Sequence, residues 1–317
     1  MTETSDLARQ LLELQEEFHW ESKSAAYELV ASWERERSGS VFHRLIGKPS
    51  GPEVVVKVSA DWASEDALRT FEAMIDLADA IEAADIAGAA AIRPLAWSEA
   101  PPQLVMPFVD GADVVSILRQ PDHPAWREDV ATWMRSAGGM LSAFHARNVA
   151  AGSAEALAEV RALAERFRVR RNFDGVDWQG RTTGSFGDFG PGNLHAGADG
   201  VLYLLDPPLA AVSSPVHRDL GNFTFELRRQ LDGRGYTASP PVTGHFDRLC
   251  DAFLQGYSDA WGSTLDETDL ALIALFELRR AAGMARKRFP GRLGDALWFA
   301  RSALARRREV IATPDHS

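Results

Sequence analysis

The spacing of apolar residues predicts a chain that begins with mixed helix and strand. Residues 5–18 carry leucines at near-helical spacing behind the capping residue Ser5, and residues 24–37 continue in helical style. The short apolar runs VFHRLIG (41–47) and EVVVKVS (53–59) are typical of strands. Because KPSGP lies between them, we expect a hairpin.

The next segments predict one long helix, two strands and then a helical remainder. Residues 64–85 repeat apolar side chains along one helix face, with Ser64 as the expected cap. AIRPLAW (91–97) and QLVMPFV (103–109) have strand patterns. Beyond these the expected helices span residues 112–119, 124–147, 154–170, 218–230, 245–261, 266–286 and 293–311.

This order predicts the α+β class, with a strand-rich start over residues 1–107 and a mainly helical remainder over residues 108–317. A chain of 317 residues can bury a substantial core as one large domain or two lobes. No segment approaches the roughly 18 apolar residues of a membrane span. The start, MTETSDLARQ, has no basic region followed by an apolar stretch, so we expect a cytoplasmic protein.

The chemistry is concentrated in FGDFGPGNLHAGADGVLYLLD, residues 186–206. Asn193 follows Asp188 by five residues, and Asp206 ends an apolar run. The turn at Gly197–Gly200 predicts a hairpin that returns Asp206 to the side of Asn193. Two acids and an amide carbonyl suit Mg²⁺ and supply one base for an attacking hydroxyl. The alternative is that Asp188 and Asn193 only shape a loop.

Two tripeptides are similar to protein-kinase signatures but do not fit their arrangement. Asp-Phe-Gly begins at Asp188 and His-Arg-Asp ends at Asp219, which reverses the order found in protein kinases. Asn222 lies three residues after Asp219, whereas the kinase asparagine lies five residues after its aspartate. A protein-kinase interpretation therefore fails.

Lys57 is one of four lysines and the only one inside an apolar strand. Alternation in VVVKV places it on the same face as Val55 and Ser59. A lysine that faces a core needs a partner or an anionic ligand. The alternative is an exposed lysine on an edge strand.

The Asp188, Asn193 and Asp206 pattern resembles the signature of the aminoglycoside phosphotransferase and choline kinase superfamily. The resemblance implies a protein-kinase-like bilobal fold, with a small β-rich N-lobe and a larger, mainly helical C-lobe. It implies ATP or GTP with Mg²⁺, and transfer of the γ-phosphate to a hydroxyl of a small molecule. Asp188 would accept or orient the hydroxyl proton, and Asn193 and Asp206 would hold the metal.

The resemblance also assigns nucleotide contacts. Lys57 would be held against the nucleotide phosphates by an ion pair with Glu72, for which Asp76 is a rival. QLVMPFVDGAD resembles the inter-lobe hinge, and because proline has no N–H, Phe108 or Val109 would contact adenine.

Supporting positions follow from the same resemblance. Ser38-Gly39-Ser40 is a weakly marked phosphate loop that is equally typical of a plain turn. His145 and Asp219 are expected to be structural, and His195 and His217 to be local hydrogen-bonding groups.

Two departures favour an alternative function. Phe186 replaces the family histidine two residues before the aspartate, and Pro207-Pro208 follow Asp206. Both would be typical of a catalytically weak, nucleotide-binding pseudokinase that acts through partners. The intact Lys57, Asp188, Asn193 and Asp206 favour an active kinase.

Charge narrows the choice of acceptor. The net charge is −10 over residues 1–107 and −1 over residues 108–317. No broad basic face is predicted, so nucleic acid is not an expected partner. The near-neutral helical region favours a neutral or anionic acceptor over a polycation, with arginines of 166–171 or 279–292 as anion contacts.

Overall fold

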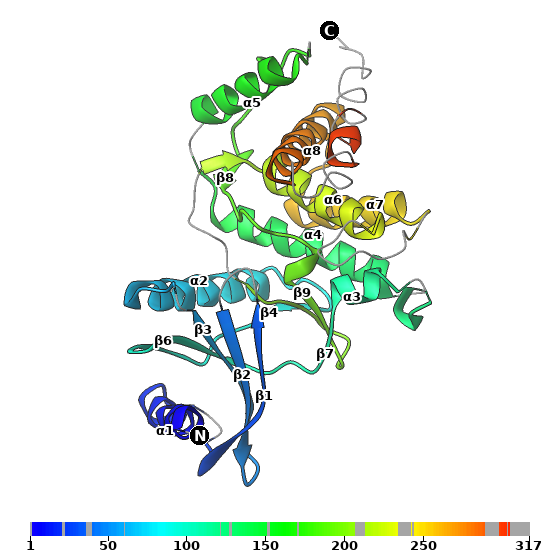
Figure 1. The fold of residues 1–317 in the computed structure, drawn as a ribbon. Helices are drawn as coiled ribbons and strands as arrows, with labels where there is room; N and C mark the ends of the chain where they lie inside the picture. The colour runs from blue at the N-terminus through cyan, green and yellow to red at the C-terminus, as the bar shows by residue number, and fades with distance from the viewer. Residues whose placement is uncertain are drawn as a thin grey trace.

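The chain folds into two lobes, with β-rich and mainly helical halves (Figure 1). This computed structural model describes residues 2–20, 23–35, 40–59, 61–120, 122–126, 129–150, 153–169, 171–206, 213–233, 242, 244–288, 298–302 and 304. Within these ranges no helix is both long and apolar enough to cross a membrane.

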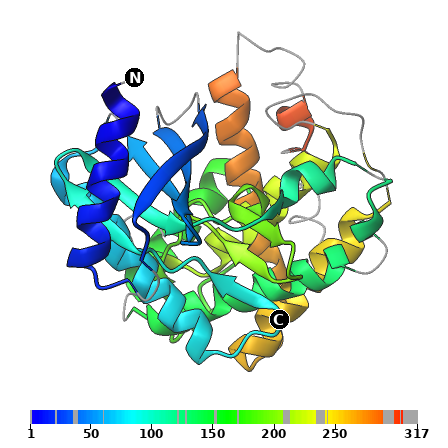
Figure 2. The same ribbon diagram turned by 90° about the horizontal axis from the view of Figure 1, so that it is seen from below.

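An antiparallel five-stranded sheet in the order β1-β2-β3-β6-β5 forms the N-lobe. Figure 2 shows helix α1 (Thr2–Glu17) beside the sheet. Leu11 and Leu14 of α1 belong to the apolar cluster on one side of the sheet, and Met74 of α2 (Ser64–Ala83) belongs to the cluster on the other. The strands are β1 (Ala26–Arg35), β2 (Ser40–Lys48), β3 (Glu53–Ser59), β5 (Ala96–Glu99) and β6 (Pro102–Pro107). Strand β3 is therefore central, so Lys57 is not on an edge.

Three sequence predictions in the N-lobe are wrong. Within residues 24–37, predicted as helical, the structure has strand β1. The strand is hard to predict because a register shift between Leu29 and Ala31 breaks its two-residue alternation. The N-cap of α2 is Ala63 and not Ser64. The strand predicted over 91–97 is replaced by β4 (Ala89–Ala91) and β5, which lie on either side of Pro94.

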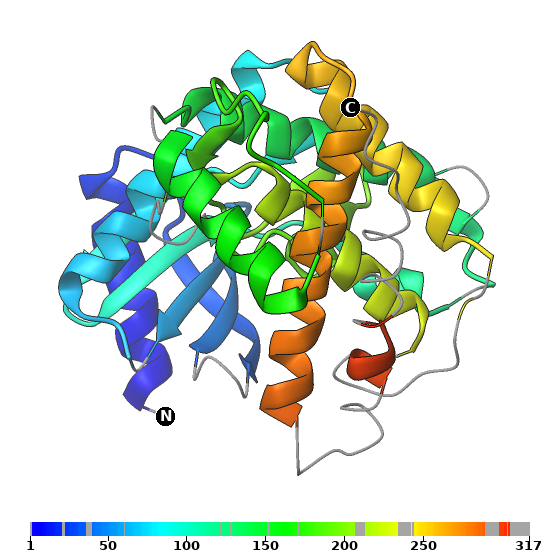
Figure 3. The same cartoon turned by 90° about the horizontal axis from the view of Figure 1, so that it is seen from above.

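The C-lobe is built from helices in nearly the predicted order. They are α3 (Val114–Leu118), α4 (Asp129–Arg147), α5 (Ser153–Phe167), α6 (His217–Leu231), α7 (Phe246–Trp261) and α8 (Glu267–Arg288), with 3-10 turns at Pro124–Trp126 and Pro191–Asn193. Of the helix predicted over 293–311, residues 298–302 and 304 are described, and these are helical. Figure 3 shows α5 and α8 side by side.

A second sheet connects the lobes. It has the order β4-β10-β9-β7, and the predicted hairpin is β9 (Leu194–Gly197) and β10 (Leu202–Leu204). Strand β4 pairs in parallel with β10, and β7 (Gly111–Asp113) pairs with β9. Gly111 has φ of 146°, and a Cβ there would lie 2.0 Å from the Ala196 carbonyl oxygen. Only glycine therefore fits this crossing.

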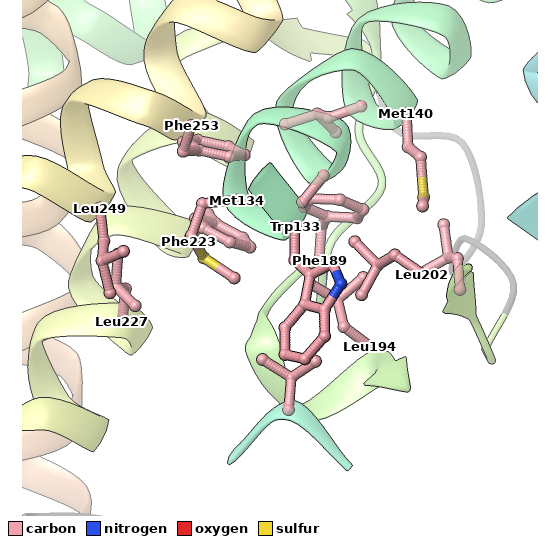
Figure 4. Packing of buried hydrophobic residues seen from close by; sticks show 14 of the residues in the cluster. Trp133, Met134, Met140, Phe189, Leu194, Leu202, Phe223, Leu227, Leu249 and Phe253 are labelled. Carbon is pink, nitrogen blue, oxygen red and sulfur yellow. The ribbon is translucent and has the colours of Figure 1, made fainter. Parts of the chain in front are cut away.

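The hairpin and the loop before it are fixed to the C-lobe core. Figure 4 shows Phe189, Leu194 and Leu202 packed among side chains of α4, α6 and α7. The labelled partners are Trp133, Met134, Met140, Phe223, Leu227, Leu249 and Phe253. Strand β8 (Thr182–Gly184), which comes directly before the loop in the chain, pairs with β11 (Ser213–Pro215). The catalytic segment predicted from sequence thus rests on a rigid support.

Candidate active site

The loop between β8 and β9 presents Asp188 to solvent. Gly187 has φ of 86°, a left-handed conformation that favours glycine, and the next residue is Asp188. Phe189 is 1% exposed, whereas the Asp188 side chain is 66% exposed. The buried ring fixes the loop, and the turn at Gly187 directs the neighbouring carboxylate outward.

A buried aspartate braces this loop from below. Asp219 accepts hydrogen bonds from the backbone N–H groups of Phe186 at 2.6 Å and Gly187 at 3.1 Å, and from the Ser185 hydroxyl at 2.9 Å. It also contacts His145 at 3.2 Å. Burial alone would raise the pKa of Asp219, but these hydrogen bonds and the His145 interaction hold it below the usual value. The structural roles expected for Asp219 and His145 are confirmed.

Phe186 takes the place of the expected histidine by packing. Its ring lies 5.2 Å from that of Phe144 and 5.0 Å from that of Phe189, both edge-on. Apolar contacts of the Phe186 ring hold the loop here, and the Phe186 backbone N–H donates to Asp219.

Asn193 and Asp206 are brought together by the hairpin. The Asn193 amide nitrogen donates to the Asp188 carbonyl at 2.9 Å, and the Leu205 N–H donates to the Asn193 carbonyl at 2.9 Å. The NH₂ group of Asn193 is engaged in this way, which leaves its side-chain carbonyl oxygen as an acceptor. One carboxylate and one amide oxygen fit a hard divalent cation whose other ligands are phosphate and water. Across the described ranges there is no cluster of three or more His, Cys, Asp or Glu side chains suited to a metal.

Lys57 meets this pair from the other lobe. Its Nζ lies 3.3 Å from an Asp206 carboxylate oxygen, and the two side chains are 15% and 27% exposed. The predicted pairing with Glu72 is wrong, because Glu72 is on the exposed face of α2. Asp76 is not the partner either, since it pairs with Arg147 at 3.2 Å.

The hinge offers one of the two predicted adenine contacts. The Phe108 N–H is committed to the Glu53 carbonyl at 2.9 Å, and its ring lies 3.7 Å from the Arg44 guanidinium. Val109 is therefore the remaining candidate donor. A cluster of buried apolar side chains adjoins the hinge. It comprises Phe42, Val55, Met74, Ile92, Leu104 and Met106, with Val109 and Leu205 packed against it. Ser38 and Gly39 of the weakly marked phosphate loop lie outside the described residues.

Arg280 and Glu226 complete the surroundings of Asp188. Arg280 lies 3.4 Å from Asp188 and 3.2 Å from Glu226. Partial loss of solvation raises the pKa of Asp188; Arg280 opposes this rise, and Glu226 and Asp206 add to it. Sequence reasoning named Arg280 only within a range and missed Glu226. A usable signal was the four-residue spacing of Arg218, Asn222 and Glu226 on one helix face.

A cavity of about 730 Å³ lies elsewhere, between α2, α4 and α7, and is lined mainly by alanine and glycine. It includes none of Lys57, Asp188, Asn193 and Asp206, and its Asp259 is paired with Arg135 at 3.0 Å. We therefore look for the chemistry in the site between the lobes.

Solved structures share this architecture. No protein-family model matches the chain, and no curated protein matches it in sequence. A protein of Ralstonia eutropha JMP134 assigned as an aminoglycoside phosphotransferase superposes with a TM-score of 0.58 at 12% identity, over 94% of this chain and 97% of that one. A microcompartment-associated aminopropanol kinase gives 0.52 at 11% identity, over 95% and 96%. A glucosamine kinase gives 0.51 at 17% identity, over 93% and 85%.

These likenesses identify the fold. The chain has the kinase-like bilobal fold that these three solved structures share. The predicted α+β class and two-lobed architecture are confirmed.

Proposed function

We propose that this protein is a phosphotransferase that moves the γ-phosphate of ATP or GTP to a hydroxyl of a small, neutral or anionic molecule. The observation that carries the proposal is the convergence of Lys57 from the N-lobe with Asp206, Asn193 and Asp188 from the C-lobe. A cytoplasmic location, as expected from the sequence, would supply the nucleotide and Mg²⁺.

Each residue has a distinct task in this proposal. Lys57 binds the nucleotide phosphates, and the Val109 backbone with its apolar neighbours holds the base. Asn193 and Asp206 hold Mg²⁺, which when bound would neutralise phosphate charge. Asp188 orients the acceptor hydroxyl and takes its proton as the new O–P bond forms and the bond to the nucleoside diphosphate breaks.

The competing function, a pseudokinase acting through partners, is less well supported. Its sequence signals were Phe186 and Pro207-Pro208. Phe186 is accommodated by aromatic packing, and the loop keeps its brace from Asp219. The two prolines lie outside the described residues.

Asp206→Ala tests the proposal. Removing the carboxylate should abolish Mg²⁺-dependent nucleotide binding, measured by calorimetry with Mg·ATP, and turnover with it. Asp79→Ala is the matched control, because Asp79 is a partly exposed acid paired with Arg93 on the outer surface of α2. Unchanged turnover in Asp206→Ala would contradict the metal assignment.

A further inference from the structure

Three further arginines lie near Arg280, the residue that is 3.4 Å from Asp188. Arg218 at the start of α6 and Arg279 on α8 both approach the same Glu159 carboxylate oxygen of α5, each at 4.0 Å. This separation is beyond hydrogen-bond distance, so neither guanidinium is tied to the glutamate. Arg166 lies seven residues after Glu159 on the same face of α5.

The electrostatic coupling of these groups confirms that they are neighbours. Burial lowers the pKa of Arg279, and the charges of Arg218, Arg280 and Arg166 lower it further, against the opposing effect of Glu159. Arginine clusters of this kind attract a planar, bidentate anion such as phosphate or carboxylate.

Some buried polar atoms of these arginines and of Asn222 have no hydrogen-bond partner in the part of the chain that the structure describes. Among the described residues, Arg218 Nε, Asn222 Oδ1 and Arg280 Nε are buried without a hydrogen bond. Arg218, Asn222 and Glu226 are spaced four residues apart, so they lie on one face of α6. Native proteins rarely leave buried polar atoms without a hydrogen bond, and a polar ligand bound beside Arg218, Asn222 and Arg280 would supply the missing bonds.

The acid beside Asp188 is not available to bind a cationic acceptor. Glu226 is already paired with Arg280 at 3.2 Å and with Arg229 at 2.5 Å, and it is 13% exposed. An ammonium group would have to displace two guanidinium groups to reach it. Glu226 therefore offers little to a positively charged acceptor.

We infer that the acceptor is a small hydroxylated molecule bearing a phosphate or carboxylate group, which Arg218 and Arg279 bind while its hydroxyl reaches Asp188. Arg166 contributes charge at the rim, and Arg280 lies between the anion site and the carboxylate. Arg218 and Glu226 are eight residues apart, about 12 Å along the helix axis. Allowing for the reach of the arginine side chains, this separation suits a single sugar or polyol with an anionic substituent. The inference rests on the proposed phosphotransferase function.

Matched pairs of acceptors test it directly. Ribose 5-phosphate, glycerol 3-phosphate and gluconate are compared with ribose, glycerol and glucose, with kanamycin as a polycation, in a coupled nucleoside-diphosphate assay. We expect the anionic member of a pair to have the higher kcat/KM. Binding of the phosphate esters is also measured by calorimetry in saturating Mg·ADP, which keeps Lys57 and the metal ligands occupied.

The arginines are tested by Arg218→Gln and Arg279→Gln. Each should raise the KM for the anionic acceptor about tenfold to a hundredfold, the range for a lost charge-assisted hydrogen bond, and leave the affinity for Mg·ATP unchanged. Lysine at either position should restore part of the affinity, because charge is retained. Arg161→Gln is the control: Arg161 is on α5, two residues from Glu159, and pairs with Asp174 at 2.8 Å.

The possible results separate this inference from the proposed function. If the wild-type protein fails to bind Mg·ATP, the proposed function is wrong. A separate titration of the phosphate esters into nucleotide-free wild type and the two arginine variants then reports whether esters bind through Arg218 and Arg279. The inference is overturned if Mg·ATP binds but the anionic group brings no gain, or if the arginine variants bind the esters as wild type does. Turnover of a phosphoserine peptide and of no small ester would also overturn it.

Discussion

Asp188 is the residue on which the chemistry depends most, and its position makes it separable from nucleotide binding. Asp188→Asn keeps the shape of the side chain but removes its ability to take a proton. We expect nucleotide affinity to stay within a few-fold of wild type and phosphoryl transfer to fall by about two or more orders of magnitude. Single-turnover transfer and calorimetry measure the two effects. Asp199→Asn, in the exposed hairpin turn beside Tyr203, is the control. Wild-type transfer by Asp188→Asn would require another base.

Arg280 tunes the same carboxylate, which leads to a pH prediction. Desolvation raises the pKa of Asp188, and Arg280 lowers it. Arg280→Gln leaves desolvation and the charges of Glu226 and Asp206 unopposed, so the pKa of Asp188 rises further. Because the active form is deprotonated, activity is lost as pH falls through this pKa. The acidic limb of the kcat/KM profile should therefore move to higher pH than in wild type. A limb that stays in place or moves to lower pH contradicts this account of Asp188.

At the residue scale, the sequence predicts which site residues lie together when they are close in the chain. It does not predict this for residues that only a tertiary contact brings together. Asp188 and Asn193 lie just before one hairpin and Asp206 lies just after it, so the spacing in the chain predicts that the hairpin brings them together. The partner of Lys57 depends on how a strand of one lobe meets a loop of the other, and Glu72 was chosen in place of Asp206. Glu226 joins the site from another helix, and its four-residue spacing from Asn222 and Arg218 marks a helix face but not the loop that this face meets.

At the scale of elements, α4 and α7 pack so closely that one added methyl group between them should destabilise the protein. A Cβ at Gly256 would lie 1.9 Å from the Arg135 carbonyl oxygen, a backbone atom that cannot move alone. Gly256→Ala should lower the free energy of unfolding by about 1–3 kcal/mol, as overpacking does. Gly283→Ala on α8 is the control. A Cβ there has nothing within 4 Å, so we expect no loss and a gain of up to about 1 kcal/mol. Denaturant unfolding of both variants measures the difference, and equal stabilities would contradict the tight packing.

Helices were easier to predict than strands, for a physical reason. The helices α4, α6, α7 and α8 bury one face over many turns, so their period persists along the chain. Strand β1 loses its two-residue period at the irregularity after Leu29, and short strands such as β4 carry three residues of signal. The order of strands in the sheets depends on long-range pairing that no local pattern records.

At the scale of the whole molecule, two connections hold the lobes together at the site. Strand β4 follows α2 yet pairs with β10 of the catalytic hairpin, which carries the chain on to Asp206. Lys57 on the central N-lobe strand then forms an ion pair with Asp206. A nucleotide that binds both groups therefore joins the lobes more strongly than either group alone, so nucleotide binding should be visible in global stability.

We accordingly expect Mg·ATP to raise the melting temperature of the protein. A ligand at 100 times its Kd that binds only the folded state adds about 2.7 kcal/mol, or roughly 5 °C for a chain of this size. Lys57→Met should lose most of this shift, measured against its own nucleotide-free melting temperature, because the cation that binds the phosphates is gone. Lys48→Met is the control, since Lys48 lies on the neighbouring strand β2 and pairs with Glu28 at the surface. It should keep the full shift. Equal shifts in the two variants would remove Lys57 from the nucleotide site, and with it the reason for a lysine in the middle of this sheet.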